Sequence, residues 1–181
     1  CSPKPAMSLV DRLNNIKFNV IYEFIRRKFF SKDDNKLKLY FYYGVMGSSK
    51  TANALMKKFS FEERGKKVAL LKSSIDNRSG KTTIKSRVGL CSEAIVVNSD
   101  GYIKDVISPK DFDIIIVDEA QFLAASQVDE LREMANNGIM IMCYGLKTDF
   151  TCHLFEGSKR IIEVCDTIRE IQCMCTKCGT K

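Results

Sequence analysis

Eight consecutive residues combine glycines, hydroxyl side chains and a lysine in an order suited to holding phosphate: Gly44, Val45, Met46, Gly47, Ser48, Ser49, Lys50 and Thr51. An alternating apolar pattern over residues 37–43 precedes them, and apolar residues at helical spacing follow over 52–59, so we expect strand, loop and helix. In that setting backbone N–H groups and the positive helix end face the phosphates, Lys50 adds a point charge, and the Thr51 hydroxyl can hold magnesium. The pattern therefore predicts an ATP site with Mg²⁺.

The phosphate loop departs from its usual pattern at one position. Glycine normally comes immediately before the lysine, whereas this chain has Ser49 there and a glycine at Gly47. Glycine suits that position because it allows backbone torsions and a close phosphate approach that a Cβ hinders. Nucleotide affinity is therefore an open question, and a serine-rich turn without a ligand is the alternative interpretation.

A second group of polar side chains, Asp118, Glu119 and Gln121, ends the apolar run over residues 114–117. We expect this run to be a buried strand that ends next to the strand before the phosphate loop. An acidic pair at such a place suits a magnesium-binding Asp followed by a catalytic carboxylate. We therefore place Asp118 and Gln121 at the ATP site, with Asp118 and Thr51 as magnesium ligands.

Composition limits the class of protein. With 181 residues, 45% of them hydrophobic, the chain can form one core and an appendage, and no apolar run approaches the ~20 residues of a membrane span. Most of the net charge of +7 comes from residues 1–38, which hold nine Lys/Arg against four Asp/Glu. A basic surface for nucleic acid is therefore not indicated for the main domain.

Three regions follow from the pattern along the chain: residues 1–36, 37–172 and 173–181, the last of which is the start of a cysteine-rich segment. The first is predicted to be a basic amphipathic helix with a linker; it could contact an anionic membrane, but packing on its own domain or a sister subunit is favoured. The second alternates strands and helices, which predicts an α/β fold with a mainly parallel sheet and helices on both faces. Its expected elements are strands at 68–71, 94–98, 114–117 and 139–143, a helical turn over 101–107, a helix over 126–136 and a long polar loop over 76–89.

Together these residues resemble the type II thymidine kinases, a family with a P-loop sheet and a zinc-bearing lasso. Further matching pieces occur in family order: Lys72, then residues 75–78, 86–89, 144–150, 154–158 and 175–179. The resemblance covers residues 39 to about 179 and implies ATP-dependent phosphorylation of the 5′-hydroxyl of deoxythymidine or a related pyrimidine deoxynucleoside.

The resemblance assigns catalytic roles. Glu119 matches the general base, which would take the proton of the sugar hydroxyl as it attacks the γ-phosphate. Arg87 matches an arginine near the phosphates that could offset transition-state charge, and Arg78 could act similarly. Both arginines lie in a polar stretch, so a solvated surface role is the alternative.

The resemblance also assigns the nucleoside pocket to five apolar residues: Met46, Phe122, Leu146, Phe150 and Phe155. Aromatic and apolar walls suit stacking on a flat base. The alternative is that these residues belong to the hydrophobic core, which fits Leu146 better than Phe122.

Cys175 and Cys178 have the spacing of zinc ligands, and Cys173 is an additional thiol. The family takes two more ligands from a later segment that also carries the lasso, and the sequence given ends at Lys181, so we expect an incomplete zinc site and an incomplete pocket. The family resemblance further implies a homotetramer, and the kinase-like motifs favour the cytosol, where structural disulfides are rare.

Two other functions stay open. The residues from Asp118 to Gln121 also resemble a motif of helicase-type ATPases, although the chain lacks room for a second motor domain. A non-catalytic nucleotide-binding module is the other alternative, and Ser49, the apparently missing lasso and the N-terminal extension all favour it.

Overall fold

The computed structural model describes residues 39–76, 80, 82–173 and 178–179. The chain divides into two units, residues 1–36 and 37–181, and the architecture below belongs to the second. The predicted N-terminal helix, Arg78 and Cys175 lie outside the described residues. No helix in the described part of the chain is long and apolar enough to cross a membrane.

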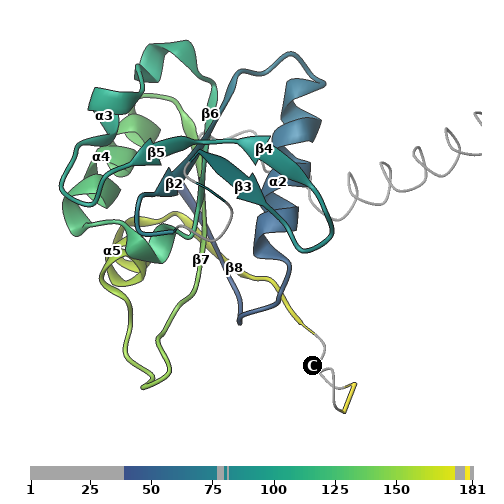
Figure 1. The fold of residues 1–181 in the computed structure, drawn as a ribbon. Coiled ribbons are helices and arrows are strands. Elements are labelled where there is room, and N and C mark those ends of the chain that lie inside the picture. Colours follow the sequence, from purple (N-terminus) through teal and green to yellow (C-terminus); the bar gives the residue numbers. More distant parts are fainter. Residues whose placement is uncertain (1–38, 77–79, 81, 174–177, 180–181) are drawn as a thin grey trace, which may run out of the picture. The chain divides into compact units, whose positions relative to one another are not determined.

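A six-stranded sheet forms the centre of this unit, and every pair of neighbouring strands in it is parallel. Its order is β5-β2-β6-β7-β1-β8 (Figure 1). The strands are β1 (Leu39–Tyr43), β2 (Val68–Ser73), β5 (Ile95–Val97), β6 (Ile114–Asp118), β7 (Met140–Gly145) and β8 (Thr167–Glu170). The prediction of a mainly parallel α/β sheet is therefore confirmed.

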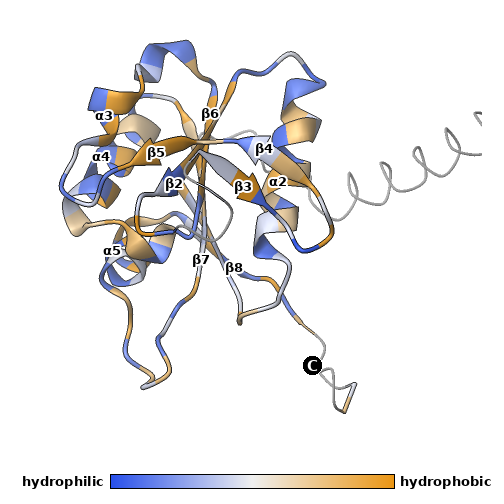
Figure 2. Cartoon of the chain, viewed as in Figure 1, coloured by the Kyte–Doolittle hydropathy of each residue, from blue (hydrophilic) through white to orange (hydrophobic). Residues whose placement is uncertain are grey.

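Helices cover both faces of the sheet, as predicted. Figure 1 shows α2 (Lys50–Glu62) on one side and α3 (Ile103–Val106), α4 (Ala125–Asn136) and α5 (Glu156–Val164) on the other. Figure 2 shows hydrophobic residues on β5 and β6 and mixed stripes on the helices, as expected when one side of each helix meets the sheet. Parallel strands buried on both faces read as continuous apolar runs, which explains the stretch from Ile114 to Val117.

Alternation along β1 divides its side chains between the two faces. Leu39 and Phe41 join the core on the side of α3, α4 and α5, together with Leu131 and Ile161. On the α2 side, the buried ring of Tyr144 stacks on Tyr42 with 4.8 Å between ring centroids, and the Tyr144 hydroxyl donates to Asn53 Oδ1 at 3.1 Å. The α2 face is therefore fixed to the sheet by aromatic packing and a buried hydrogen bond.

Three features differ from the sequence prediction. The strands that precede the two polar motifs are not neighbours, because β7 lies between β1 and β6; the motifs still share one edge, since all these strands are parallel and end there. The predicted polar loop over 76–89 contains β3 (Thr83–Lys85), which pairs antiparallel with β4 (Cys91–Glu93). Finally, α5 and β8 were not predicted from the pattern; β8 is a half-exposed edge strand with little apolar signal.

Candidate active site

The lysine of the phosphate loop is anchored beneath the loop itself. Lys50 Nζ donates to the carbonyl oxygens of Gly44 at 3.0 Å and Val45 at 2.8 Å, and it lies 3.4 Å from Ser48 Oγ. The α2 helix begins at Lys50, so its first N–H groups and its positive end lie at the loop. This arrangement provides the fixed donors that a phosphate group requires.

Ser49 has a left-handed backbone conformation, with φ 58° and ψ 28°. Gly47 also has a positive φ, of 92°. The physical reason for glycine at this position is thus confirmed: the loop demands left-handed torsions, and here a serine adopts them. The Ser49 side chain is exposed and makes no capping hydrogen bond to the helix.

Asp118, at the end of β6, is a buried carboxylate with an unsatisfied oxygen. It is 3% exposed, and its Oδ1 has no hydrogen-bond partner. Burial, followed by the nearby charges of Glu119 and Asp76, raises its pKa from 3.8 to about 6, against the opposing effect of a hydrogen bond from Thr51. A cation would offset these costs, and a carboxylate beside a hydroxyl is a donor set that Mg²⁺ accepts.

The described residues contain no group of three His, Cys, Asp or Glu side chains arranged to hold a metal ion. Mg²⁺ is usually held by one or two protein ligands together with substrate phosphates and water, so such a cluster is not required. Asp118 and Thr51 therefore fit Mg²⁺ as the predicted ligands.

Glu119 also has a left-handed backbone, with φ 51° and ψ 42°, and it precedes the 3-10 turn η2 (Ala120–Phe122). Its side chain is 7% exposed. The amide of Gln121 donates from Nε2 to Glu119 Oε2 at 2.5 Å. Strained backbone at a carboxylate facing a cavity is typical of functional sites.

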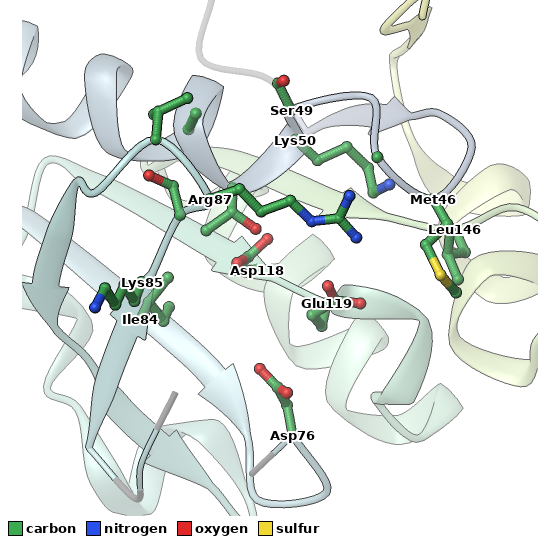
Figure 3. Close-up of a pocket in the computed structure, with 15 residues that line it drawn as sticks. Met46, Ser49, Lys50, Asp76, Ile84, Lys85, Arg87, Asp118, Glu119 and Leu146 are labelled. Carbon is green, nitrogen blue, oxygen red and sulfur yellow. The ribbon is translucent and has the colours of Figure 1, made fainter. Parts of the chain in front are cut away.

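A cavity of about 270 Å³ joins these groups. Its walls come from the phosphate loop and the start of α2, from the ends of β2, β6 and β7, and from β3 and the turn after it. They include Met46, Gly47, Ser49, Lys50, Thr51, Asp76, Arg87, Asp118, Glu119 and Leu146. Figure 3 shows Lys50, Arg87, Asp118 and Glu119 around one space, with Met46 and Leu146 together at one end.

Arg87 reaches the phosphate loop from the turn between β3 and β4. That turn is held closed by Ser86, whose backbone N–H and hydroxyl both donate to the Leu90 carbonyl. A Cβ placed on Gly47 would lie only 3.5 Å from Arg87 Nη1. The structure thus brings this predicted arginine to the phosphate side of the cavity.

Seven of the predicted ligand contacts are not among the residues that line this cavity: Gly44, Val45 and Ser48 of the phosphate loop, together with Gln121, Phe122, Phe150 and Phe155. Phe122 and Phe155 are partly buried and pack edge to face, with ring centroids 6.0 Å apart. Phe150 is 97% exposed. Gln121 is 2% exposed and contacts Glu119 rather than the open space.

Of the cysteines proposed to bind zinc, the structure describes Cys173 and Cys178. Cys178 is exposed. Cys173 Sγ lies 3.8 Å from the Gly47 carbonyl oxygen, close to the phosphate loop.

Sequence reasoning did not give Asp76 a role, although it lines the cavity and is 8% exposed. Lys72 Nζ lies 3.8 Å from Asp76 Oδ2 and donates to the carbonyl oxygens of Gly80 and Thr83. A signal was present: Asp76 follows β2 as Asp118 ends β6, and these neighbouring parallel strands end at the same edge.

The fold and the site define a P-loop type of α/β nucleotide-binding protein with a carboxylate beside the phosphate loop. The thymidine kinase family profile matches residues 37–181. A thymidine kinase of Zymomonas mobilis is 40% identical over 149 residues, 80% of this chain and 77% of the relative. Another, of Encephalitozoon cuniculi, is 42% identical over 143 residues, 77% and 67% of the two chains. The chain therefore belongs to the thymidine kinase family.

Among solved structures, the Pif1 helicase of Candida albicans aligns with 93% of this chain and 40% of its own length. The TM-score is 0.44 and the sequence identity is 13%. Likeness at this level carries no argument about function.

Proposed function

We propose that this chain transfers the γ-phosphoryl group of ATP to the 5′-hydroxyl of deoxythymidine. Membership of the thymidine kinase family supports the reaction. The observation that carries the proposal is the shared cavity, in which the lysine-bearing end of α2 faces the Asp118–Glu119 pair. A triphosphate at the helix end and an acceptor hydroxyl at the carboxylate would lie across one space of about 270 Å³.

The cationic groups at the cavity bind the phosphates, and the carboxylates bind the proton and the metal ion. Lys50 and the first N–H groups of α2 hold the β- and γ-phosphates, and Arg87 offsets the negative charge on the transferring group. Glu119 accepts the proton of the 5′-hydroxyl as its oxygen bonds to phosphorus and the bond to ADP breaks. Asp118 and Thr51 would hold Mg²⁺, which when bound neutralises phosphate charge.

The nucleoside end of the cavity is assigned to Met46 and Leu146, which lie together on the side away from Ile84 and Lys85 (Figure 3). Phe122 and Phe155 form the adjacent aromatic pair. Contact of these rings and of Phe150 with the base stays a prediction.

The reaction is tested with ATP labelled in its γ-phosphate and a panel of pyrimidine and purine deoxynucleosides. We expect label on deoxythymidine, and we expect Glu119→Gln to lower kcat by about 10²- to 10⁴-fold while nucleotide binding persists. Folded wild-type protein that labels no pyrimidine deoxynucleoside would overturn the proposal. In that case, ATP binding measured by calorimetry would favour the non-catalytic nucleotide-binding module. ATP hydrolysis stimulated by RNA or DNA would instead favour the helicase-type ATPase.

The cofactor and assembly predictions complete the proposal. Mg²⁺ is the expected metal at Asp118 and Thr51, and zinc binding at Cys175 and Cys178, with Cys173 as a further thiol, stays a prediction. Elemental analysis of the purified chain measures the zinc content, and light scattering measures the predicted homotetramer. A cytosolic location also stays a prediction.

A further inference from the structure

The side chain of Gln121 joins the proposed base to the wall of the nucleoside pocket. Its Nε2 donates to Glu119 Oε2 at 2.5 Å, and its Oε1 accepts from the backbone N–H of Leu146 at 3.1 Å. A backbone N–H cannot accept a hydrogen bond, so the oxygen of the amide must face Leu146 and its nitrogen must face Glu119. The uncharged amide makes both contacts at once, whereas an ionised carboxylate in its place would have no proton to donate to Glu119.

The turn that carries this amide is closely packed on two sides. A Cβ on Gly145 would lie 2.7 Å from Gln121 Oε1, which explains glycine at the end of β7. On the other side, a Cβ on Gly157 would lie 2.7 Å from the Ala120 carbonyl oxygen, so α5 packs directly on the turn η2. The turn η2, which carries Gln121, is consequently packed between β7 and α5.

The contact at Leu146 is fixed through both backbone groups. Its N–H donates to Gln121, and its carbonyl oxygen accepts from Ser158 Oγ at 2.5 Å. Ser158 is 0% exposed and lies in the first turn of α5. The pocket wall, the turn and the carboxylate therefore form one connected unit.

We infer that Gln121 is a positioning residue that holds the Glu119 carboxylate in line with the nucleoside hydroxyl by tying it to Leu146. The inference rests on the proposed kinase function and replaces the sequence-based assignment of Gln121 to ATP binding. Because Gln121 does not line the cavity, it acts through Glu119 and Leu146 rather than on a ligand. A general base displaced by about 1 Å loses about 10²-fold in rate.

Two variants separate the two hydrogen bonds of the Gln121 amide, one to Glu119 and one from Leu146. Gln121→Glu keeps an oxygen for the Leu146 N–H but removes the donor to Glu119, whereas Gln121→Met removes both. For Gln121→Glu we expect kcat to fall about 10- to 100-fold with the nucleoside KM within about twofold. For Gln121→Met we expect the same fall in kcat and a higher nucleoside KM, since the Leu146 N–H loses its acceptor.

Gln127 offers a matched control for the loss of a buried glutamine. It is 1% exposed and donates to the carbonyl oxygens of Asn98 and Gly101, away from the cavity. Gln127→Met should lower Tm as much as Gln121→Met while leaving kcat unchanged. Equal losses of kcat in the two variants would show that Gln121 is only structural.

The pH dependence of kcat provides a further test, because a purely structural role for Gln121 would not change it. In Gln121→Glu the introduced carboxyl regains a donor when protonated, so its kcat relative to wild type should rise as pH falls from about 8 to about 6. The other ionisable groups at the cavity, Lys50, Asp76, Lys85, Arg87, Asp118 and Glu119, are common to both proteins. Active wild type with an unchanged Gln121→Glu kcat would overturn the inference; inactive wild type would instead overturn the proposed function.

Discussion

The strained backbone of Ser49 predicts that Ser49→Gly stabilises the protein. A side chain in the left-handed region costs about 1–2 kcal/mol, and Ser49 recovers none of it through a helix cap. Glycine removes this strain but costs about 0.5–1 kcal/mol in additional freedom of the unfolded chain. The expected net gain in the free energy of unfolding is about 0.5–1 kcal/mol.

Urea and thermal unfolding measure the effect, which corresponds to a rise in Tm of about 1–4 °C for a domain of this size. The neighbouring Ser48 provides the control. It has no positive φ, it is 3% exposed, and its Oγ lies 3.4 Å from Lys50 Nζ. Ser48→Gly therefore relieves no strain and should destabilise the protein by about 1 kcal/mol.

The opposite signs at two adjacent serines make the comparison decisive. If Ser49→Gly were no more stable than wild type, or if both variants changed stability alike, left-handed strain at Ser49 would not be the cause. We also expect Ser49→Gly to lower the KM for ATP, because the phosphate can approach the loop more closely without a Cβ.

Three further predictions concern the charges at the cavity. Because the pKa of folded Asp118 is raised from 3.8 to about 6, the folded state binds more protons and the free energy of unfolding should fall as pH rises through that window. Asp118→Asn should remove this pH dependence, and in urea unfolding without metal its free energy of unfolding at pH 7 should exceed that of wild type by about 3 kcal/mol. If the difference between variant and wild type were the same at pH 4 and pH 7, the prediction would be wrong. Arg87→Ala should lower kcat about 10- to 10³-fold, with Arg87→Lys intermediate, in the labelled-ATP assay; equal rates would place Arg87 outside the reaction. Chelation by EDTA should abolish phosphoryl transfer and reduce the rise in Tm caused by ATP. If the activity and the full rise in Tm both persisted in EDTA, Mg²⁺ at Asp118 and Thr51 would be excluded.

The parts of the fold that were predictable are those with strong burial. The run from Ile114 to Val117 is buried on both faces, and α4 buries Val128, Leu131 and Met134 at helical spacing, so both left clear patterns. Two of the missed elements bury little: β3 has one buried side chain, Ile84, and β8 has none. The third, α5, was also missed although it buries Ile161 in the core. Elements at an edge leave weak hydrophobic signals because one side of them faces water.

In the candidate site too, residues next to a predicted strand end were predictable, whereas contacts between residues far apart in the sequence were not. Lys50, Asp118 and Glu119 were predicted because each sits next to a strand end that the sequence reveals. The role of Gln121 depends on Leu146, 25 residues away, and only the packed structure brings them together. The order of strands is similarly non-local, so β7 between β1 and β6 could not be read from spacing.

The place of β1 in the sheet has a consequence for biosynthesis. Both of its partners, β7 and β8, come from the C-terminal part of the sequence, starting at Met140 and Thr167. At about 5–20 residues per second, a ribosome needs about 5–20 s after completing β1 to deliver the first of them. During that interval the apolar Leu39 and Phe41 have no sheet to enter, so the nascent chain should be a client for chaperones until β7 emerges.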